Sequence, residues 1–174
     1  GYARTADGHA VFSDDLQFAT AEGEHWPGGA VRLGWRGEHP GDGPLEVSAD
    51  RLDLSALTRI GQRLPLPAAM REALSAHQPQ GQLERLKAQW QDNPSGARYS
   101  AKGLWRQARL KPALVAGHWP LPGVQGADLD FDFDQSKGRV QLKMHAGWIE
   151  GALGLSEPRL AVDKGQADVE WPVS

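Results

Sequence analysis

The chain of 174 residues carries a formal net charge of −3, so no basic field argues for nucleic acid as its partner. It contains no cysteine, which excludes a disulfide framework, a cysteine-based zinc site and a thiol nucleophile. The 21 glycines and 12 prolines exceed average usage and predict many turns between short strands. The longest apolar runs, such as ALVAG at 113–117, are too short to span a bilayer.

The N-terminal part of the chain alternates apolar and polar residues with period 2, which is typical of half-buried strands. Strands are predicted over 8–20, 29–36 and 44–52, with a bulge at Ser13–Asp15 in the first of them.

The pattern then becomes helical. In DLSALTRIGQRL the apolar residues recur at helical spacing, which predicts a helix over 54–64 with Asp53 as its N-cap. A second amphipathic helix is predicted over 68–77, and the prolines at 65 and 67 kink the chain between the two pieces. We expect this two-piece insertion at about 54–77 to pack on the sheet as a lid or end cap. Binding to a membrane surface is the alternative, although its cations are few.

Period 2 returns after Pro79. Leu86, Ala88 and Trp90 alternate while Leu83 falls out of phase, which predicts a bulge near Glu84–Arg85. The following segments are predicted as a turn at 93–96, a strand over 97–112 and a loop at 117–123, and from 126 onward strands and turns alternate.

The stretch GADLDFDFDQSKGRVQLKMHAG at 126–147 places an aspartate at every second position: Asp128, Asp130, Asp132 and Asp134. If QSKG at 135–138 closes a hairpin with Asp134 opposite Arg139, acids face bases or amides on one side. The other side then pairs apolar residues: Phe133 with Val140, Phe131 with Leu142, and Leu129 with Met144. A slip by one residue would spoil both faces, so we predict this register.

These aspartates are interpreted as the solvated face of a strand. A calcium loop starting at Asp128 needs glycine at its sixth position and an acid at its twelfth, where the chain has Phe133 and Arg139. A carboxylate pair for glycoside hydrolysis needs a buried acid with a raised pKa. No HExxH, GxSxG, GxGxxG or Walker loop is present, and no two histidines stand at a metal-ligand spacing. We expect no metal, no cofactor and no catalytic residue.

The end of the chain predicts a second hairpin. With Lys164–Gly165 as a two-residue turn, Val162 meets Ala167 and Leu160 meets Val169. Two hairpins that both segregate apolar from polar residues indicate an antiparallel meander with one apolar face.

Seven tryptophans leave a further alternative. An exposed row that included Trp26, Trp119 or Trp148 would suit a sugar-binding β-sandwich, as would a buried carboxylate pair. Their alternating companions are mostly aliphatic, which favours packing in the core or at its rim.

The order of several motifs resembles the AsmA-like superfamily, in particular the large YhdP-type envelope proteins of Gram-negative bacteria. The motifs are LEVSADRLDLSALTRIGQRLPLP at 45–67, PQGQLERLKAQW at 79–90, YSAKGLWRQARLKP at 99–112, PGVQGADLDFDFDQSKGRVQLKMHA at 122–146 and LAVDKGQADVEW at 160–171. The resemblance implies a periplasmic protein anchored in the inner membrane, whose strands curl into an apolar groove. It also implies a part in moving phospholipid toward the outer membrane, with no catalytic residues to carry over.

We therefore expect a mainly β fold: a curved antiparallel sheet, groove-like or a half-barrel meander, with a helical insertion at about 54–77. Because the chain begins at Gly1 inside a strand-like pattern, residues 1–174 are expected to be one segment of a longer protein. Its expected partners are phospholipid acyl chains and neighbouring segments of that protein, with membrane contact through regions outside it. The expected groove-lining residues are Leu129, Phe131, Phe133, Val140, Leu142 and Met144. The alternative is a structural or protein-interaction module with a closed core.

Overall fold

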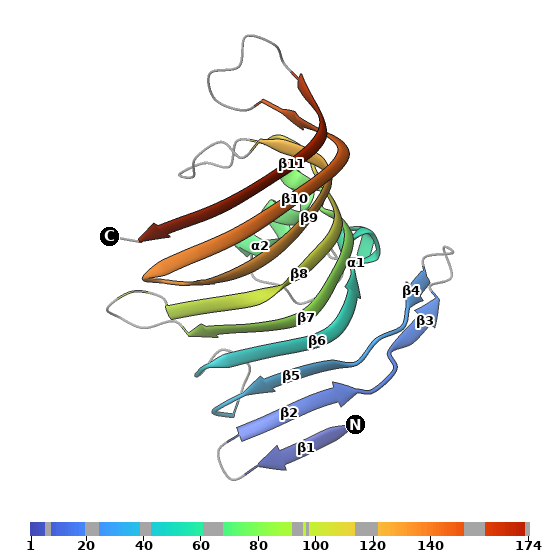
Figure 1. The fold of residues 1–174 in the computed structure, drawn as a ribbon. Helices are drawn as coiled ribbons and strands as arrows, with labels where there is room; N and C mark the ends of the chain where they lie inside the picture. Colours follow the sequence, from blue (N-terminus) through green and yellow to red (C-terminus); the bar gives the residue numbers. More distant parts are fainter. Residues whose placement is uncertain are drawn as a thin grey trace.

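The computed structural model describes residues 1–5, 8–19, 25–38, 43–60, 68–91, 96, 98–113, 122–151 and 159–172. Within these residues, nine strands form one antiparallel sheet that does not close on itself (Figure 1). They are β1 (Tyr2–Thr5), β2 (Gly8–Ser13), β5 (Val31–Trp35), β6 (Leu45–Asp53), β7 (Gln80–Gln91), β8 (Arg98–Leu110), β9 (Gly123–Asp134), β10 (Lys137–Glu150) and β11 (Arg159–Pro172). The expected fold class, a curved antiparallel sheet with two short helices, is confirmed.

The strands lie side by side in chain order, apart from the small excursion of β3 (Gln17–Ala19) and β4 (His25–Pro27). These two strands pair with each other in a separate ribbon. The single strand expected over 8–20 is therefore wrong: the chain leaves the large sheet after Ser13, through a bend at Asp14 and Asp15, and β3 pairs elsewhere. The strands expected over 29–36 and 44–52 correspond to β5 and β6.

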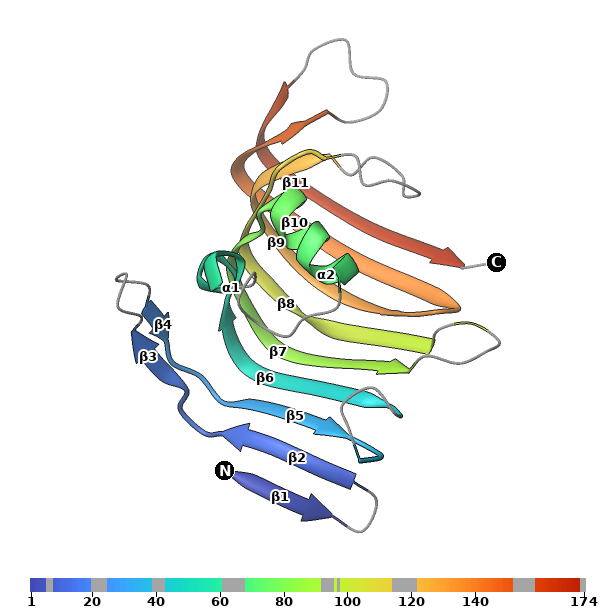
Figure 2. The same ribbon diagram turned by 180° about the vertical axis from the view of Figure 1, so that it is seen from behind.

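The helical insertion contains α1 (Leu54–Ile60) and α2 (Ala68–His77). Asp53 is the N-cap of α1, as expected, because its Oδ1 accepts a hydrogen bond of 2.9 Å from the backbone N–H of Ala56. Residues 61–67, with the kink expected at the prolines, lie outside the described residues. Both helices lie on the concave side of the bent sheet (Figure 2).

The long strands bend where bulges interrupt their pairing. Four neighbouring strands, β7 to β10, carry residues with positive φ that form a row near the bend: Gly81, Gln107, Gly126 and Ala146. The ladders shift register beside these residues. Since a bulge bends its strand and increases the local twist, this row curves the sheet. The bulge expected near Glu84–Arg85 is confirmed by a further shift in β7, where Arg85 also has positive φ.

The hairpin expected at Lys164–Gly165 is wrong. β11 continues through these residues as a single strand, with Lys164 opposite His145 and Gly165 opposite Met144. The physical reason is the length of β10, whose backbone N–H and C=O groups need partners over all 14 of its residues. A hairpin half as long would have left much of that edge unpaired.

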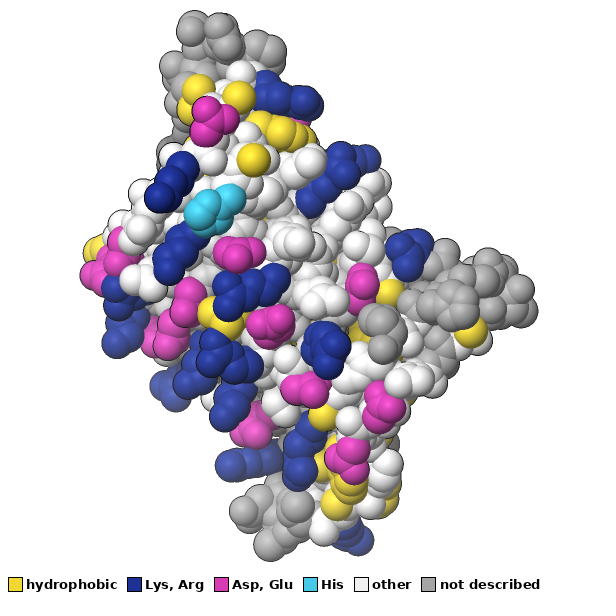
Figure 3. All heavy atoms as spheres, turned by 45° about the vertical axis from the view of Figure 1, so that its right-hand side comes forward, with side chains coloured by type: hydrophobic (Ala, Val, Ile, Leu, Met, Phe, Trp, Pro, Cys, Tyr) yellow, Lys and Arg dark blue, Asp and Glu magenta, His cyan; other side chains and the backbone are white. Residues whose placement is uncertain are grey.

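The curvature gives the sheet two unlike faces. The convex side, called the outer face here, carries the aspartates of β9 and intermingled acidic and basic side chains (Figure 3). The concave side, called the inner face, carries α1 and the apolar side chains, and the candidate site lies on it.

Candidate functional site

The hairpin of β9 and β10 builds the centre of the inner face. Its register places Phe131 opposite Val140 and Leu129 opposite Leu142. The register predicted from the sequence is therefore wrong by two residues. A shift by two keeps every side chain on its face, because strand side chains alternate with period 2. The predicted separation of apolar from acidic residues is consequently present.

The turn explains the two-residue shift. Oδ1 of Asp134 accepts hydrogen bonds from the backbone N–H of Ser136 at 2.7 Å and from that of Lys137 at 3.1 Å, and the Ser136 hydroxyl also donates to it. An aspartate that binds the backbone two residues ahead mimics a backbone turn. The loop therefore tightens to Gln135–Ser136, and Lys137 and Gly138 join β10 instead of the loop.

The structure brings all six predicted lining residues to the inner face, but not to equal depth. Met144 is only 1% exposed and packs in a closed cluster with Ala108 and Ala127. The other five are half-buried: Leu129, Phe131, Phe133, Val140 and Leu142. The hairpin thus runs from a sealed end at Met144 to an open end at Phe133.

Other strands extend the apolar surface beyond this hairpin, and sequence reasoning did not identify their residues as lining. One row crosses the sheet in register through Val11, Leu33, Val47, Ala88, Ala101, Phe133, Gly138 and Trp171. Leu33, Val47 and Ala88 belong to period-2 patterns in the sequence, whereas Gly138 was expected in the turn at 135–138. Only the order and register of the strands show that they form one surface.

Several large apolar side chains of the sheet are open to solvent. The exposed fraction is 47% for Val11, 48% for Trp90, 50% for Val169 and 38% for Trp171. Scattered exposed apolar residues are ordinary, but a contiguous patch of them marks a binding surface. Val11, Val169 and Trp171 stand in the same inner-face rows as Phe131 and Phe133, so the patch is contiguous across the sheet.

Aromatic rings border the open part of the inner face. The centroids of Trp90 and Tyr99 lie 6.0 Å apart, and Tyr99 meets Phe133 edge-on at 6.4 Å. His9 stacks on Trp35 at 5.5 Å in the neighbouring strands. Tyr, Trp and His each combine an apolar body with a polar tip, so such a border suits a transition from an apolar surface to water.

The part of the inner face near the bend is closed. Ala56 of α1 lies in one buried cluster with Trp26, Ala49 and Leu52. α1 therefore caps the sheet there, which agrees with the end cap expected of the insertion. The inner face is sealed at the bend and open toward the other strand ends.

A comparison with protein families decides the relationship of this sheet to known proteins. A family model described as YhdP protein matches residues 1–174. The chain belongs to the YhdP family. The resemblance to AsmA-like envelope proteins seen in the sequence motifs is thereby confirmed. No curated protein and no solved structure showed a significant match to the chain.

The described part of this YhdP-family chain holds no helix that is long and apolar enough to cross a membrane. Nor do its described residues bring three His, Cys, Asp or Glu side chains together in a group that could hold a metal ion.

The aspartates of β9 in this YhdP-family chain lie on the outer face, and two of them form hydrogen bonds that stabilise the sheet there. Asp128 accepts hydrogen bonds from Arg106 Nη1 at 3.2 Å and from the backbone N–H of Gln107 at 2.9 Å. Asp134 caps the hairpin turn, and those hydrogen bonds to Ser136 hold the pKa of its carboxyl below the usual range. These contacts favour a structural role for the acidic stripe.

The neighbouring strand pair, β10 and β11, is held by a stronger ion pair on the same face. Arg139 donates to both carboxylate oxygens of Asp168, at 3.1 and 2.7 Å, and Gln141 adds a third hydrogen bond at 3.0 Å. These bonds to Arg139 and Gln141 lower the pKa of Asp168 to about 2.

Proposed function

We propose that the inner face of this YhdP-family chain shields phospholipid acyl chains and forms part of an apolar groove in an envelope lipid-transport protein. The observation that carries this proposal is the contiguous apolar patch, which crosses the sheet from Val11 to Trp171 and stays open to solvent. Within the proposal, the chain belongs to the periplasmic part of a protein anchored in the inner membrane by regions outside it.

The dimensions of the sheet support this role. Nine strands about 4.8 Å apart span about 38 Å. One leaflet of a bilayer has a hydrocarbon depth of about 15 Å, so the inner face is wide enough for acyl chains that lie across its strands. Each methylene transferred from water to the apolar surface contributes about 0.8 kcal/mol.

The mechanism is passive. Phe131 and Phe133 offer a dry lining, their ring centroids lying 5.8 Å apart, and no bond is made or broken in the groove. The transfer of the acyl chain out of water is favourable, and the apolar rows around Phe131 and Phe133 present no charged group that would hold it at one position. We accordingly propose no catalytic residue for this chain.

The alternative is a closed module, in which other protein segments seal the same face. The burial of Ala49 and Leu52 beneath α1 shows that part of the face is sealed in this way. The exposure of Trp90 and Val169, at 48% and 50%, favours the open groove for the remainder.

The geometry gives little support to sugar binding. Trp26 is buried, with 6% exposed. The ring of Trp148 is covered by the Arg159 guanidinium, whose Cζ lies 4.2 Å from the ring centroid. Trp119 lies outside the described residues.

Photo-crosslinking in cells tests the proposal. A photo-reactive amino acid would replace Phe131 on the open inner face of the full-length protein, and matched probes would replace Asp130 on the outer face and Met144 in the sealed cluster. Lipid adducts are expected at position 131 and at neither control position. Crosslinks only within protein at position 131, with no lipid at any position, would show a sealed core and exclude the groove.

A further inference from the structure

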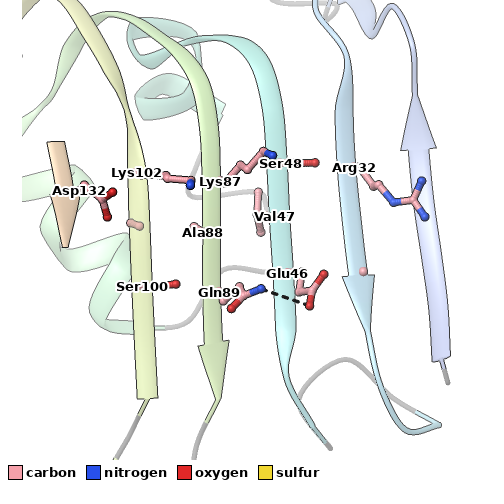
Figure 4. Close-up of a pocket in the computed structure, with 12 residues that line it drawn as sticks. Arg32, Glu46, Val47, Ser48, Lys87, Ala88, Gln89, Ser100, Lys102 and Asp132 are labelled. Atoms are coloured by element: carbon pink, nitrogen blue, oxygen red, sulfur yellow. Dashed lines mark hydrogen bonds between the residues drawn. The ribbon is translucent and has the colours of Figure 1, made fainter. Parts of the chain in front are cut away.

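The outer face carries a hollow of about 480 Å³ over β5 to β9, on the side of the sheet opposite the proposed groove (Figure 4). Its chemistry is concentrated in six of the side chains that line it: Arg32, Ser48, Lys87, Ser100, Lys102 and Asp132. We call these residues the cationic hollow.

Three cations of the hollow belong to one row across the sheet. Arg32 is opposite Ser48, Ser48 is opposite Lys87, and Lys87 is directly opposite Lys102. Like charges directly opposite each other on a sheet are unfavourable. The repulsion between Lys87 and Lys102 therefore destabilises the sheet locally unless an anion binds beside them.

No carboxylate among the described residues forms an ion pair with these cations. Arg106, Arg139 and Arg159 each form an ion pair elsewhere on the sheet. By contrast, within the described part of the chain, neither Lys87 nor Lys102 forms an ion pair, and Arg32 instead lies over the Phe12 ring at 5.8 Å.

The two acids that border the hollow leave its centre positive. Glu46 accepts a hydrogen bond from Gln89 Nε2 at 3.4 Å. Asp132 is opposite Lys102 in register, but the Lys102 side chain is directed toward β7 and away from it (Figure 4). The hollow thus contains three cations and two carboxylates, and neither carboxylate forms an ion pair with Lys87 or Lys102.

The hydroxyl groups complete the set of donors. Ser48 and Ser100 are half-buried in the lining, and neither hydroxyl forms a hydrogen bond within the described residues. A phosphate group carries several acceptor oxygens and can accept from two ammonium groups and a hydroxyl together. It would also remove the repulsion between the lysines.

We propose that the cationic hollow is a binding site for a phosphate group. Two sources share this chemistry: a soluble phosphorylated compound and the headgroup phosphate of a lipid surface. The proposal does not depend on the acyl-chain groove, because the six side chains of the cationic hollow and the apolar rows of the groove project from opposite faces of the sheet.

The test measures binding of inorganic pyrophosphate to the purified full-length protein by calorimetry. The test variant combines Lys87→Gln with Lys102→Gln. The control combines Lys143→Gln with Lys164→Gln, which removes the same charge from two exposed lysines outside the hollow. We expect the test variant to weaken binding at least tenfold and the control to change it less than twofold.

Vesicles with and without phosphatidylglycerol distinguish the two sources. Vesicle binding that needs Lys87 and Lys102, and that pyrophosphate inhibits, would assign the site to lipid headgroups. Pyrophosphate binding without vesicle binding would assign it to soluble phosphates. Equal losses in both double variants would show only a general charge effect and would overturn the proposal, as would no saturable binding of either probe to the unaltered protein. Thermal unfolding of each variant checks that the sheet is intact.

Discussion

The carboxylate of Asp128 accepts a hydrogen bond of 2.9 Å from the backbone N–H of Gln107, the residue at which β8 bulges. The bulge takes this amide out of the ladder, and the side chain from the next strand replaces the lost acceptor. Asp128 also binds Arg106 at 3.2 Å, and Arg106 reaches Glu84 at 3.6 Å. The carboxylate thus stabilises the bend that makes the sheet concave.

Replacing Asp128 with alanine is expected to lower the free energy of unfolding by about 1 kcal/mol. The loss arises mainly from the unpaired Gln107 amide, and partial exposure keeps it small. Urea unfolding measures it. Asp130→Ala removes a carboxylate from the same strand face without a bulge to cap, and is expected to cost less than about 0.5 kcal/mol. Equal losses in the two variants would contradict the capping role.

The ring of Trp171 lies over Gly138, where an added Cβ would come within 2.2 Å of the ring. Gly138→Ala is therefore expected to displace the ring and to destabilise the protein by about 1 kcal/mol or more. Gly34→Ala is the control, since its nearest neighbour would be 3.8 Å away. That change is expected to be neutral or slightly stabilising.

A double-mutant cycle identifies the cause of the Gly138 effect. In a Trp171→Ala background, the cost of Gly138→Ala should largely disappear, because no ring remains to be displaced. An unchanged cost would place the effect in the backbone of β10 instead.

The pairing of Asp168 with Arg139 predicts a pH dependence of stability. The pKa of Asp168 is lowered from 3.8 to about 2 in the folded protein, so its ionised form is favoured by folding. Its contribution is present above pH 4 and is lost as the pH falls toward 2. Asp168→Asn should flatten the decline of the urea midpoint in this window. Asp132→Asn is the matched control, and an equal flattening by that variant would refute the assignment to Asp168.

The N-cap of α1 predicts a loss of stability at the sealed end of the inner face. Asp53→Ala removes the acceptor of the Ala56 amide and is expected to cost about 1 kcal/mol. Asp53→Asn keeps an acceptor oxygen and should retain most of the stability. Denaturant unfolding of the two variants provides the measurement, and an equally large loss with asparagine would favour a role for the charge over the cap.

Two errors show where prediction from the sequence stopped. The register of the β9–β10 hairpin was missed by two residues because Asp134 binds the backbone of Ser136 and Lys137, and loop length depends on such contacts. The hairpin at Lys164–Gly165 was missed because that segment pairs with β10. A turn motif is a local feature of the sequence, and it carries no information about a distant strand whose backbone needs hydrogen-bond partners.

The amino-acid sequence by itself determined the strand character of most segments, the two-piece insertion, the bulge near Arg85 and the division into an apolar and a polar face. These properties follow from period-2 and helical spacing, which are local and survive a shift in register by two residues. Tertiary structure alone decided which part of the apolar face α1 seals, which part stays open beside Phe133, and that Lys87 stands opposite Lys102. These features join residues far apart in the chain, so they depend on the order and curvature of nine strands and not on any single segment.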